Sequence, residues 1–317
     1  MKKIRWGVLG FARIAKNEGI PAIIESGNGM VYAVASRSEE KLQEARELFT
    51  PCMLYSDYET LLEDEDIDAV YIPLPNALHR EWAMKAMRKG KHVLCEKPLA
   101  LNEQEVREMA EAARENGVLL MEGFMYRYTR RMDKVMEILE SGVLGEIRHV
   151  DSSFRFFLNR ENTIKMKKEL GGGALYDVGC YPVSFISLIL GEEPEEIRVL
   201  TEETDQVDVQ ISALLKYRGG KMAALHAGFN AFGRNYSEII GTTGRLEIPD
   251  TFLDVEGSLV LHTEKGREEI PVEGCHRYTL EFQDFARAVL EGGSPLVTLE
   301  ESIRTSRIMD RIFEAMR

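Results

Sequence analysis

Short apolar runs alternate with amphipathic segments along the first part of the chain. The apolar runs have the length of buried strands and lie at 3–9, 30–35, 69–74, 93–97 and 118–121. The segments between them place apolar residues at helical spacing, over 39–49, 58–65, about 79–89 and about 103–116. Strands that alternate with helices in this way predict an α/β fold with a doubly wound parallel sheet of the Rossmann type.

The pattern changes after about residue 122, where strand-like segments follow one another with few helices between them. These segments lie at 146–157, 195–203, 207–217, 221–230, 235–241, 244–256, 258–263 and 267–272. Turn sequences such as Arg218-Gly219-Gly220 separate several of them, which predicts an α+β domain with a large, mostly antiparallel sheet. We therefore expect two domains, 1–122 and 123–317, with an amphipathic helix at about Leu299–Met316 that packs back on the first.

The second sheet has too few helices to cover both of its faces. An uncovered sheet face is free to pack on a partner subunit, and large exposed apolar patches usually mark association sites. The pattern therefore predicts a homodimer, or a tetramer built from dimers, through this sheet.

Composition narrows the class of protein. The 317 residues carry a net charge of −13, which argues against nucleic acid and anionic membrane surfaces as partners. The sequence contains no run of about eighteen apolar residues, so no membrane span is predicted. The opening Lys2-Lys3 segment is interrupted by Arg5 and Gly7, so it is not expected to be a signal peptide.

The cysteines are scattered, without a Cys-x-x-Cys pair or a His/Cys cluster at metal-ligand spacing. This predicts free thiols in a reducing cytoplasm and no metal site. The four residues are Cys52, Cys95, Cys180 and Cys275.

The first strand runs directly into Gly10-x-Ala12-x-x-Ala15. This is the dinucleotide-binding fingerprint with its two later glycines replaced by alanine. Gly10 suits the tight turn, and the two alanines are small enough for a pyrophosphate to approach the backbone and for a helix to pack on the strand.

The second strand ends in Ser36-Arg37-Ser38, where a protein that binds NAD normally carries an acidic residue for the ribose 2′-hydroxyl. A hydroxyl and a guanidinium suit a 2′-phosphate instead, so NADP is predicted over NAD. The alternative is that Arg37 is a solvated residue at the start of the next helix. Ser38 is expected to cap that helix.

The strand at 93–97 stops at Lys97 because Pro98 cannot donate to a sheet ladder and keeps the preceding residue out of the helical region. Ligands of open α/β sheets bind outside the carboxyl ends of the strands, so Lys97 is a candidate for a catalytic group. The alternative is a surface lysine.

A second informative stretch begins with Gly171-Gly172-Gly173, after which a helix is expected near Ala174. Asp177 and Tyr181 are four positions apart and fall on one face of that helix. Asp177 also lies in the first turn, where the helix dipole favours its ionised form. The alternative is a capping aspartate and a core tyrosine.

Together these motifs resemble the Gfo/Idh/MocA oxidoreductases over essentially the whole chain. The resemblance rests on Gly10-x-Ala12-x-x-Ala15, Pro75-Asn76-x-x-His79, Glu96-Lys97-Pro98 and the glycine-rich segment that leads to Asp177 and Tyr181. The chain is most similar to the branch with glucose-fructose oxidoreductase, D-xylose dehydrogenase and dimeric dihydrodiol dehydrogenase, in which a tyrosine replaces the usual histidine. That branch carries an arginine where this chain has Lys165, and a lysine offers a point charge in place of a bidentate fork.

The resemblance implies an NADP-binding first domain and a substrate-binding second domain. The expected cofactor-binding residues are Gly10, Phe11, Ala12, Arg13, Ile14, Ser36, Arg37, Lys41, Pro73, Leu74, Pro75, Asn76, His79, Glu96 and Lys97. For His79 the alternative is a residue that merely starts a helix. The expected substrate-lining residues are Phe124, Tyr126, Arg155, Phe157 and Lys165.

The implied activity is hydride transfer between NADP and a small molecule, a sugar or polyol-like alcohol or carbonyl compound. Such a reaction needs a group that takes or gives a proton at the substrate oxygen, and we expect Lys97 and Tyr181 to share this task. Asp177 is expected to orient the substrate or to hold Lys97. The alternatives are a non-sugar carbonyl or dihydrodiol as substrate, or a non-catalytic NADP-binding regulator, which the retention of all three residues disfavours.

Overall fold

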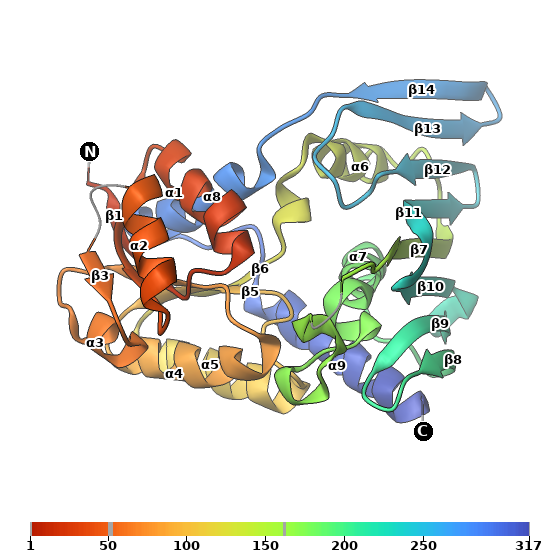
Figure 1. The fold of residues 1–317 in the computed structure, drawn as a ribbon. Coiled ribbons are helices and arrows are strands. Elements are labelled where there is room, and N and C mark those ends of the chain that lie inside the picture. The colour runs from red at the N-terminus through yellow and green to blue at the C-terminus, as the bar shows by residue number, and fades with distance from the viewer. Residues whose placement is uncertain (1, 50–52, 161–162, 317) are drawn as a thin grey trace. The chain divides into compact units, whose positions relative to one another are not determined.

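The computed structural model describes residues 2–49, 53–160 and 163–316. Its contacts divide the chain into two units, each with its own sheet (Figure 1). The first unit combines Met1–Met125 with His276–Leu299, and the second combines Tyr126–Cys275 with Glu300–Arg317.

The first unit contains a six-stranded parallel sheet in the order β3-β2-β1-β4-β5-β6. The strands are β1 (Ile4–Leu9), β2 (Gly29–Ala35), β3 (Met53–Tyr55), β4 (Ala69–Ile72), β5 (His92–Glu96) and β6 (Leu120–Gly123). This confirms the predicted doubly wound parallel sheet. The central strands β4 and β5 are almost entirely buried, as expected for strands covered on both faces.

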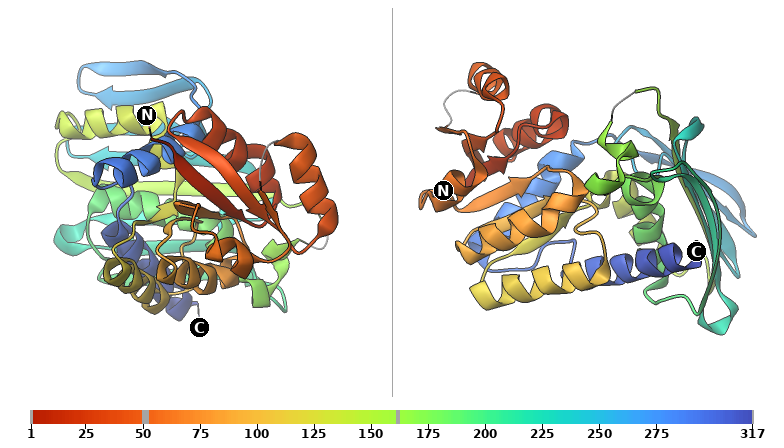
Figure 2. Two further views of the ribbon diagram at one scale, coloured as in Figure 1. Left: turned by 90° about the vertical axis from the view of Figure 1, so that its left-hand side faces the viewer. Right: turned by 60° about the horizontal axis from the view of Figure 1, so that its bottom comes forward.

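Helices cover both faces of this sheet (Figures 1 and 2). They are α1 (Ile20–Glu25), α2 (Glu39–Leu48), α3 (Tyr58–Glu63), α4 (His79–Arg88), α5 (Glu103–Asn116) and α8 (Arg277–Glu291). Short helical turns precede two of them, η1 (Ala15–Gly19) before α1 and η2 (Asn76–Leu78) before α4.

The C-terminal part of the chain contributes α8 to the first unit. The ring of Trp6 on β1 lies 5.1 Å from that of Phe282 and 5.0 Å from that of Phe285 on α8. This role was predicted for the last helix, α9 (Leu299–Ala315), but the contacts group Glu300–Arg317 with the second unit. There Arg304 Nε donates to Ser187 Oγ at 2.9 Å.

The second unit contains an eight-stranded sheet in the order β14-β13-β12-β11-β7-β10-β9-β8. The strands are β7 (Ile147–Phe157), β8 (Glu196–Glu203), β9 (Asp208–Lys216), β10 (Met222–Gly228), β11 (Asn230–Gly241), β12 (Gly244–Pro249), β13 (Gly257–Thr263) and β14 (Gly266–Val272). All neighbours are antiparallel except β7 and β10, which confirms the predicted mostly antiparallel sheet.

Three helices lie on one face of this sheet: α6 (Arg130–Glu140), α7 (Cys180–Leu190) and α9 (Figures 1 and 2). The segment Lys168–Leu190, which includes α7, is long and apolar enough for a membrane span by length and composition. However, 78% of its most apolar stretch is buried inside the protein, so its apolar character is that of a core helix.

The described cysteines Cys95, Cys180 and Cys275 form no disulfide, and Cys52 lies outside the described residues. Within the ranges that the structure describes, no group of three or more His, Cys, Asp and Glu residues could hold a metal ion.

Candidate active site

The turn after β1 is shaped by Gly10, which has a φ of 100°. A Cβ atom at this position would lie 2.9 Å from the Leu74 side chain and 3.3 Å from the Tyr58 hydroxyl. Only glycine is compatible with both the backbone angle and the available space. The helix that follows begins within Ala12–Ala15, so its first N–H groups border the turn. This glycine cradle, which a side chain would fill, fits the pyrophosphate of a dinucleotide.

The end of β2 combines a buried serine with an exposed arginine. Ser36 is buried and its Oγ accepts a hydrogen bond from Ser38 N at 3.2 Å. The exposed Arg37 lies beside the Tyr58 hydroxyl, where it opposes the rise in the pKa of Tyr58 that burial causes. Because Tyr58 also borders Gly10, the guanidinium lies close to the turn after β1.

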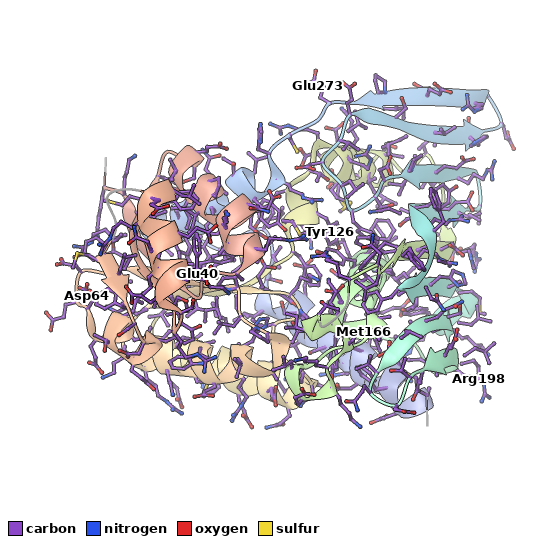
Figure 3. All side chains as sticks on the ribbon, in the orientation of Figure 1. Glu40, Asp64, Tyr126, Met166, Arg198 and Glu273 are labelled. Atoms are coloured by element: carbon purple, nitrogen blue, oxygen red, sulfur yellow. The ribbon has the colours of Figure 1, made fainter. Side chains whose placement is uncertain are left out.

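The predicted helix cap at Ser38 is confirmed, since its side chain accepts a hydrogen bond from Lys41 N at 3.3 Å. Glu39 and Glu40 occupy the first turn of α2, where they complement the helix dipole (Figure 3, where Glu40 is labelled). Six further predicted cofactor residues lie at the carboxyl-terminal ends of strands of the parallel sheet, as Gly10 and Arg37 do. They are Pro73, Leu74, Pro75 and Asn76 after β4, and Glu96 and Lys97 at the end of β5. Phe11, Ala12, Arg13 and Ile14 follow Gly10 directly, and Lys41 lies on α2.

Lys97 follows β5 directly and is partly exposed. Glu96, the preceding residue, is buried and accepts a hydrogen bond from the Tyr71 hydroxyl at 2.6 Å. Burial raises the pKa of Glu96, while Tyr71 and Lys97 oppose that rise. The carboxylate of Glu96 therefore lies inside the first unit, next to the lysine.

A second buried carboxyl group lies near Glu96. Glu281 on α8 has no exposed surface, and neither of its oxygen atoms has a hydrogen-bond partner among the described residues. Burial and then the charge of Glu96 raise its pKa well above the usual range. Burial and the neighbouring carboxyl group of Glu96 therefore both disfavour the ionised form of Glu281. Helical periodicity gives no sign that an acidic residue is buried, so Glu281 was not among the predicted residues.

His79 connects the loop after β4 with the loop after Lys97. Its Nδ1 lies 2.8 Å from the carbonyl oxygen of Pro98, and its Nε2 lies 2.8 Å from that of Leu74. The ring is completely buried, and burial followed by the charge of Lys97 lowers its pKa. Both ring nitrogens therefore face protein carbonyl groups, and the side chain supports the loops of the expected cofactor site from behind.

In the second unit, the triple glycine leads into η6 (Leu175–Gly179), a π-helical turn that continues into α7. Asp177 lies in this turn and forms an ion pair with Lys165. The Lys165 ammonium also lies 5.5 Å from the ring centroid of Phe156 on β7. The lysine at the position where related proteins are expected to carry arginine therefore fixes the carboxylate of Asp177.

Tyr181 lies in the first turn of α7 and is only 4% exposed. Its ring centroid lies 5.3 Å from that of Phe154, 5.4 Å from that of Phe252 and 6.0 Å from that of Tyr126. The buried Tyr126 hydroxyl lies 3.0 Å from Ser184 Oγ, and burial raises its pKa to about 12 (Figure 3, where Tyr126 is labelled). Tyr181 is thus held by an aromatic cage.

The predicted substrate-lining residues on β7 require a correction. Phe154 contacts Tyr181 and Phe156 contacts Lys165, so these two residues lie on the face of the sheet that carries the candidate site. Side chains alternate along a strand, so Arg155 and Phe157 lie on the opposite face. Consistent with this, Arg155 lowers the pKa of His226, which pairs with Ser153 across the strands, and Phe157 is 64% exposed. The β7 residues on the face that carries Tyr181 are thus Phe154 and Phe156, one position away from the two predicted ones.

The other predicted substrate-lining residues have different surroundings. Phe124 is buried in the first unit directly after β6, and Tyr126 and Lys165 belong to the second unit. Phe154 and Phe252, which contact Tyr181, were not among the predicted residues. Alternation along 146–157 could have identified Phe154 once Tyr181 was placed on the buried face, whereas Phe252 lies in a turn after β12 that was predicted as strand.

Comparison with known proteins identifies the class of protein. The family model described as "Oxidoreductase family, NAD-binding Rossmann fold" matches residues 4–124, and the model "GFO/IDH/MocA C-terminal domain" matches residues 132–247. The chain therefore belongs to the Gfo/Idh/MocA family of NAD(P)-dependent oxidoreductases, which confirms the family resemblance.

Two characterised relatives match nearly the whole chain. A dTDP-3,4-didehydro-2,6-dideoxy-alpha-D-glucose 3-reductase from Actinomadura kijaniata is 37% identical over 315 residues, which cover 98% of this chain and 94% of the relative. A D-xylose 1-dehydrogenase (NADP(+)) from Haloferax volcanii is also 37% identical, over 317 residues, which cover 98% of this chain and 96% of the relative. A crystal structure of the Actinomadura 3-ketoreductase with NADP and TDP-benzene has a TM-score of 0.94 at 34% identity and covers 99% and 98% of the two chains.

Proposed function

We propose that this protein is an NADP-dependent oxidoreductase that transfers a hydride between the nicotinamide and a sugar or polyol-like alcohol or carbonyl compound. The observation that carries the proposal is the combination of Lys97 at the carboxyl end of β5 with Tyr181 in the first turn of α7, in a chain of this family. Both relatives described above are named as enzymes that act on sugars or sugar nucleotides.

Lys97 and Tyr181 are proposed to share the movement of a proton at the substrate oxygen. NADP, when bound, supplies or accepts the hydride, so the chain's own task is to orient the substrate and to manage the proton. Lysine and tyrosine side chains in water both have pKa values of about 10. A cationic Lys97 would favour the ionised form of Tyr181, and a side chain that can change its charge at neutral pH serves as acid or base.

Structures of two variants of the Actinomadura ketoreductase lend support, since one replaces a lysine and the other a tyrosine. That lysine and tyrosine are separated along their chain by the same number of residues as Lys97 and Tyr181. Asp177, fixed by Lys165, is proposed to orient the substrate through its carboxylate.

NADP is proposed over NAD because Ser36 and Arg37 replace the acidic residue that would bind a ribose 2′-hydroxyl. Arg37 is exposed and close to the turn at Gly10, where it can pair with a 2′-phosphate and stack on adenine. The name of the Haloferax relative includes NADP(+), and the Actinomadura 3-ketoreductase was crystallised with NADP.

A second candidate substrate class is a non-sugar carbonyl compound or a dihydrodiol, because a trans-1,2-dihydrobenzene-1,2-diol dehydrogenase from Xenopus laevis is 31% identical to this chain over 326 residues. The test is to incubate the protein with NADP⁺ and a panel that includes D-xylose, D-glucose and a trans-dihydrodiol, while reduction of the cofactor is followed by its absorbance. Reduction with one class selects that substrate. Tight NADP binding without any reduction, in either direction, would instead support a non-catalytic regulator.

A homodimer, or a tetramer built from dimers, is proposed to form through the face of the second sheet opposite α6, α7 and α9 (Figures 1 and 2). Leu200 and Leu214 on this face are 81% and 54% exposed, and Arg198 lies beside them (Figure 3). Leu214→Lys should shift the protein to monomer in light scattering, and a wild-type monomer at micromolar concentration would contradict the proposal.

A cytoplasmic location is proposed from the thiol state of the described cysteines.

A further inference from the structure

Asp208 at the start of β9 is a buried acidic residue that the proposed chemistry does not use. The residue is only 5% exposed, and its Oδ2 accepts a hydrogen bond from Leu175 N at 2.7 Å. The backbone N–H of Ala174 also stabilises its charged form. The carboxylate of Asp208 therefore satisfies N–H groups at the start of the helical segment that runs from Leu175 through α7.

The adjoining glycine leaves room for this carboxylate. Gly173 has a φ of 122°, and a Cβ atom at this position would collide with Asp208 Oδ1. Any side chain at position 173 would thus displace the carboxylate from the helix start. The last glycine of the triple-glycine segment and Asp208, which is distant in the sequence, form one structural unit.

The helical segment that Asp208 holds carries both candidate catalytic residues of the second unit. Asp177 lies in its first turn, and Tyr181 follows one turn later. A shift at the helix start would move the Asp177 carboxylate relative to Lys165 and the Tyr181 hydroxyl relative to its aromatic cage. We propose that Asp208 is a positioning residue for Asp177 and Tyr181, and that protonation of its carboxylate releases the helix start and slows turnover; this proposal rests on the proposed function.

The groups around Asp208 determine the pH at which its carboxyl group titrates. Burial raises its pKa to about 6, the backbone N–H groups of the helix start oppose this rise, and Glu203 on the neighbouring β8 adds to it. Asp177 on η6 is paired with Lys165, and His226 on β10 lies 2.9 Å from the Ser212 hydroxyl. Asp208 is therefore charged at neutral pH and becomes neutral as the pH falls through about 6.

The test compares wild type with Asp208→Asn and with Glu203→Gln as a matched control that removes a neighbouring, exposed carboxylate. The asparagine keeps the shape of the side chain but carries no charge. Wild-type kcat, measured with the substrate identified by the panel, should fall with a midpoint near pH 6. Asp208→Asn should already have about tenfold lower kcat at neutral pH, because hydrogen bonds to a charged acceptor are replaced by weaker ones, and should lack this step. Glu203→Gln should keep wild-type kcat.

Two further readouts do not depend on turnover. Because burial opposes the charge of Asp208, Asp208→Asn should unfold at a temperature no lower than wild type at neutral pH, and its NADP affinity should be unchanged. Amide hydrogen exchange of Ala174–Tyr181 should be faster in the variant than in wild type, whereas exchange in α6 should be equal. These results support the proposal even if no substrate is found.

Three outcomes would overturn the proposal. In the first, Asp208→Asn has wild-type kcat and the same fall of kcat at acid pH. In the second, the variant fails to fold. In the third, amide hydrogen exchange at the helix start is the same as in wild type. The first would make Asp208 a purely structural residue, and the second would show that its charge stabilises the fold.

Discussion

The two units hold their candidate catalytic residues in different ways. In the first unit, Lys97 follows a buried parallel strand, and its loop is tied to the loop after β4 by His79. In the second unit, Tyr181 and Asp177 lie at the start of a helix packed on the face of a mostly antiparallel sheet, and their neighbours come from β7, β9 and the turn after β12.

This difference determines how each part of the site can be inferred. Ligand-binding loops follow the carboxyl ends of the strands in a parallel sheet, so each candidate residue there is marked by a local motif. On the face of a sheet, side chains alternate, and an error of one position moves a residue to the opposite side. Candidate residues of the first unit can therefore be identified from short motifs. Those of the second unit can be identified only from the strand register and from contacts between distant segments.

The largest effect is expected for Lys97→Met, which tests the contribution of the first unit. Loss of a general acid–base group lowers turnover by ~10²–10⁴-fold. The methionine is of similar length, so the fold and NADP affinity should stay close to wild type. Turnover is measured by NADP reduction, with cofactor binding and thermal unfolding as controls. A variant within a few-fold of wild-type turnover would exclude the catalytic role.

Tyr181→Phe makes the corresponding change in the second unit. It removes one hydroxyl group and keeps the ring contacts with Phe154, Phe252 and Tyr126. Turnover should fall by ~10²-fold, with little change in stability, because only the proton-transferring atom is lost. If the variant instead loses stability and keeps its activity per folded molecule, Tyr181 is a core residue.

A smaller effect is expected at Arg37, which distinguishes the two cofactors. Arg37→Asp replaces a partner for the 2′-phosphate with a charge that repels it and with an acceptor for a free 2′-hydroxyl. Charged hydrogen bonds contribute roughly 1.5–3 kcal/mol, so NADP affinity should fall by about tenfold to a hundredfold while NAD affinity rises. Dissociation constants of both cofactors test this. Wild type that binds NAD at least as tightly as NADP would show that Arg37 is merely solvated.

The smallest effects test the register of β7 through a matched pair of variants. Phe154→Ala removes a ring that contacts Tyr181 and stacks on Phe252 at 5.6 Å, so it should destabilise the protein by about 2 kcal/mol and lower turnover. Phe157→Ala, on the opposite face and 64% exposed, should leave turnover unchanged and should cost less stability. Equal losses of turnover in the two variants would contradict the assigned faces.

Periodicity and local motifs were sufficient to predict much of the fold and part of the site. The alternation of strands and helices predicted the parallel sheet, and Pro98 correctly marked the end of β5 next to Lys97. The serine cap of α2 was also predicted correctly, because capping depends on neighbouring residues alone.

Other features depend on contacts that no local pattern encodes. Both α8 and α9 are amphipathic, and it takes contacts such as those of Phe282 and Phe285 with Trp6 to show that α8 joins the first unit. The burial of Asp208 and of Glu281 follows from the packing of distant elements, since acidic residues are usually exposed and no local pattern marks these two as buried.

Lys97 and Tyr181, from two different units, are proposed to serve one proton-transfer step. The most direct test is a double-mutant cycle with Lys97→Met, Tyr181→Phe and the double variant, each measured as kcat with saturating NADP⁺. Residues that act as a unit are strongly non-additive, so the double variant should be within a few-fold of the slower single variant. A double variant whose loss equals the product of the two single losses would show that the residues act independently, and would contradict this account.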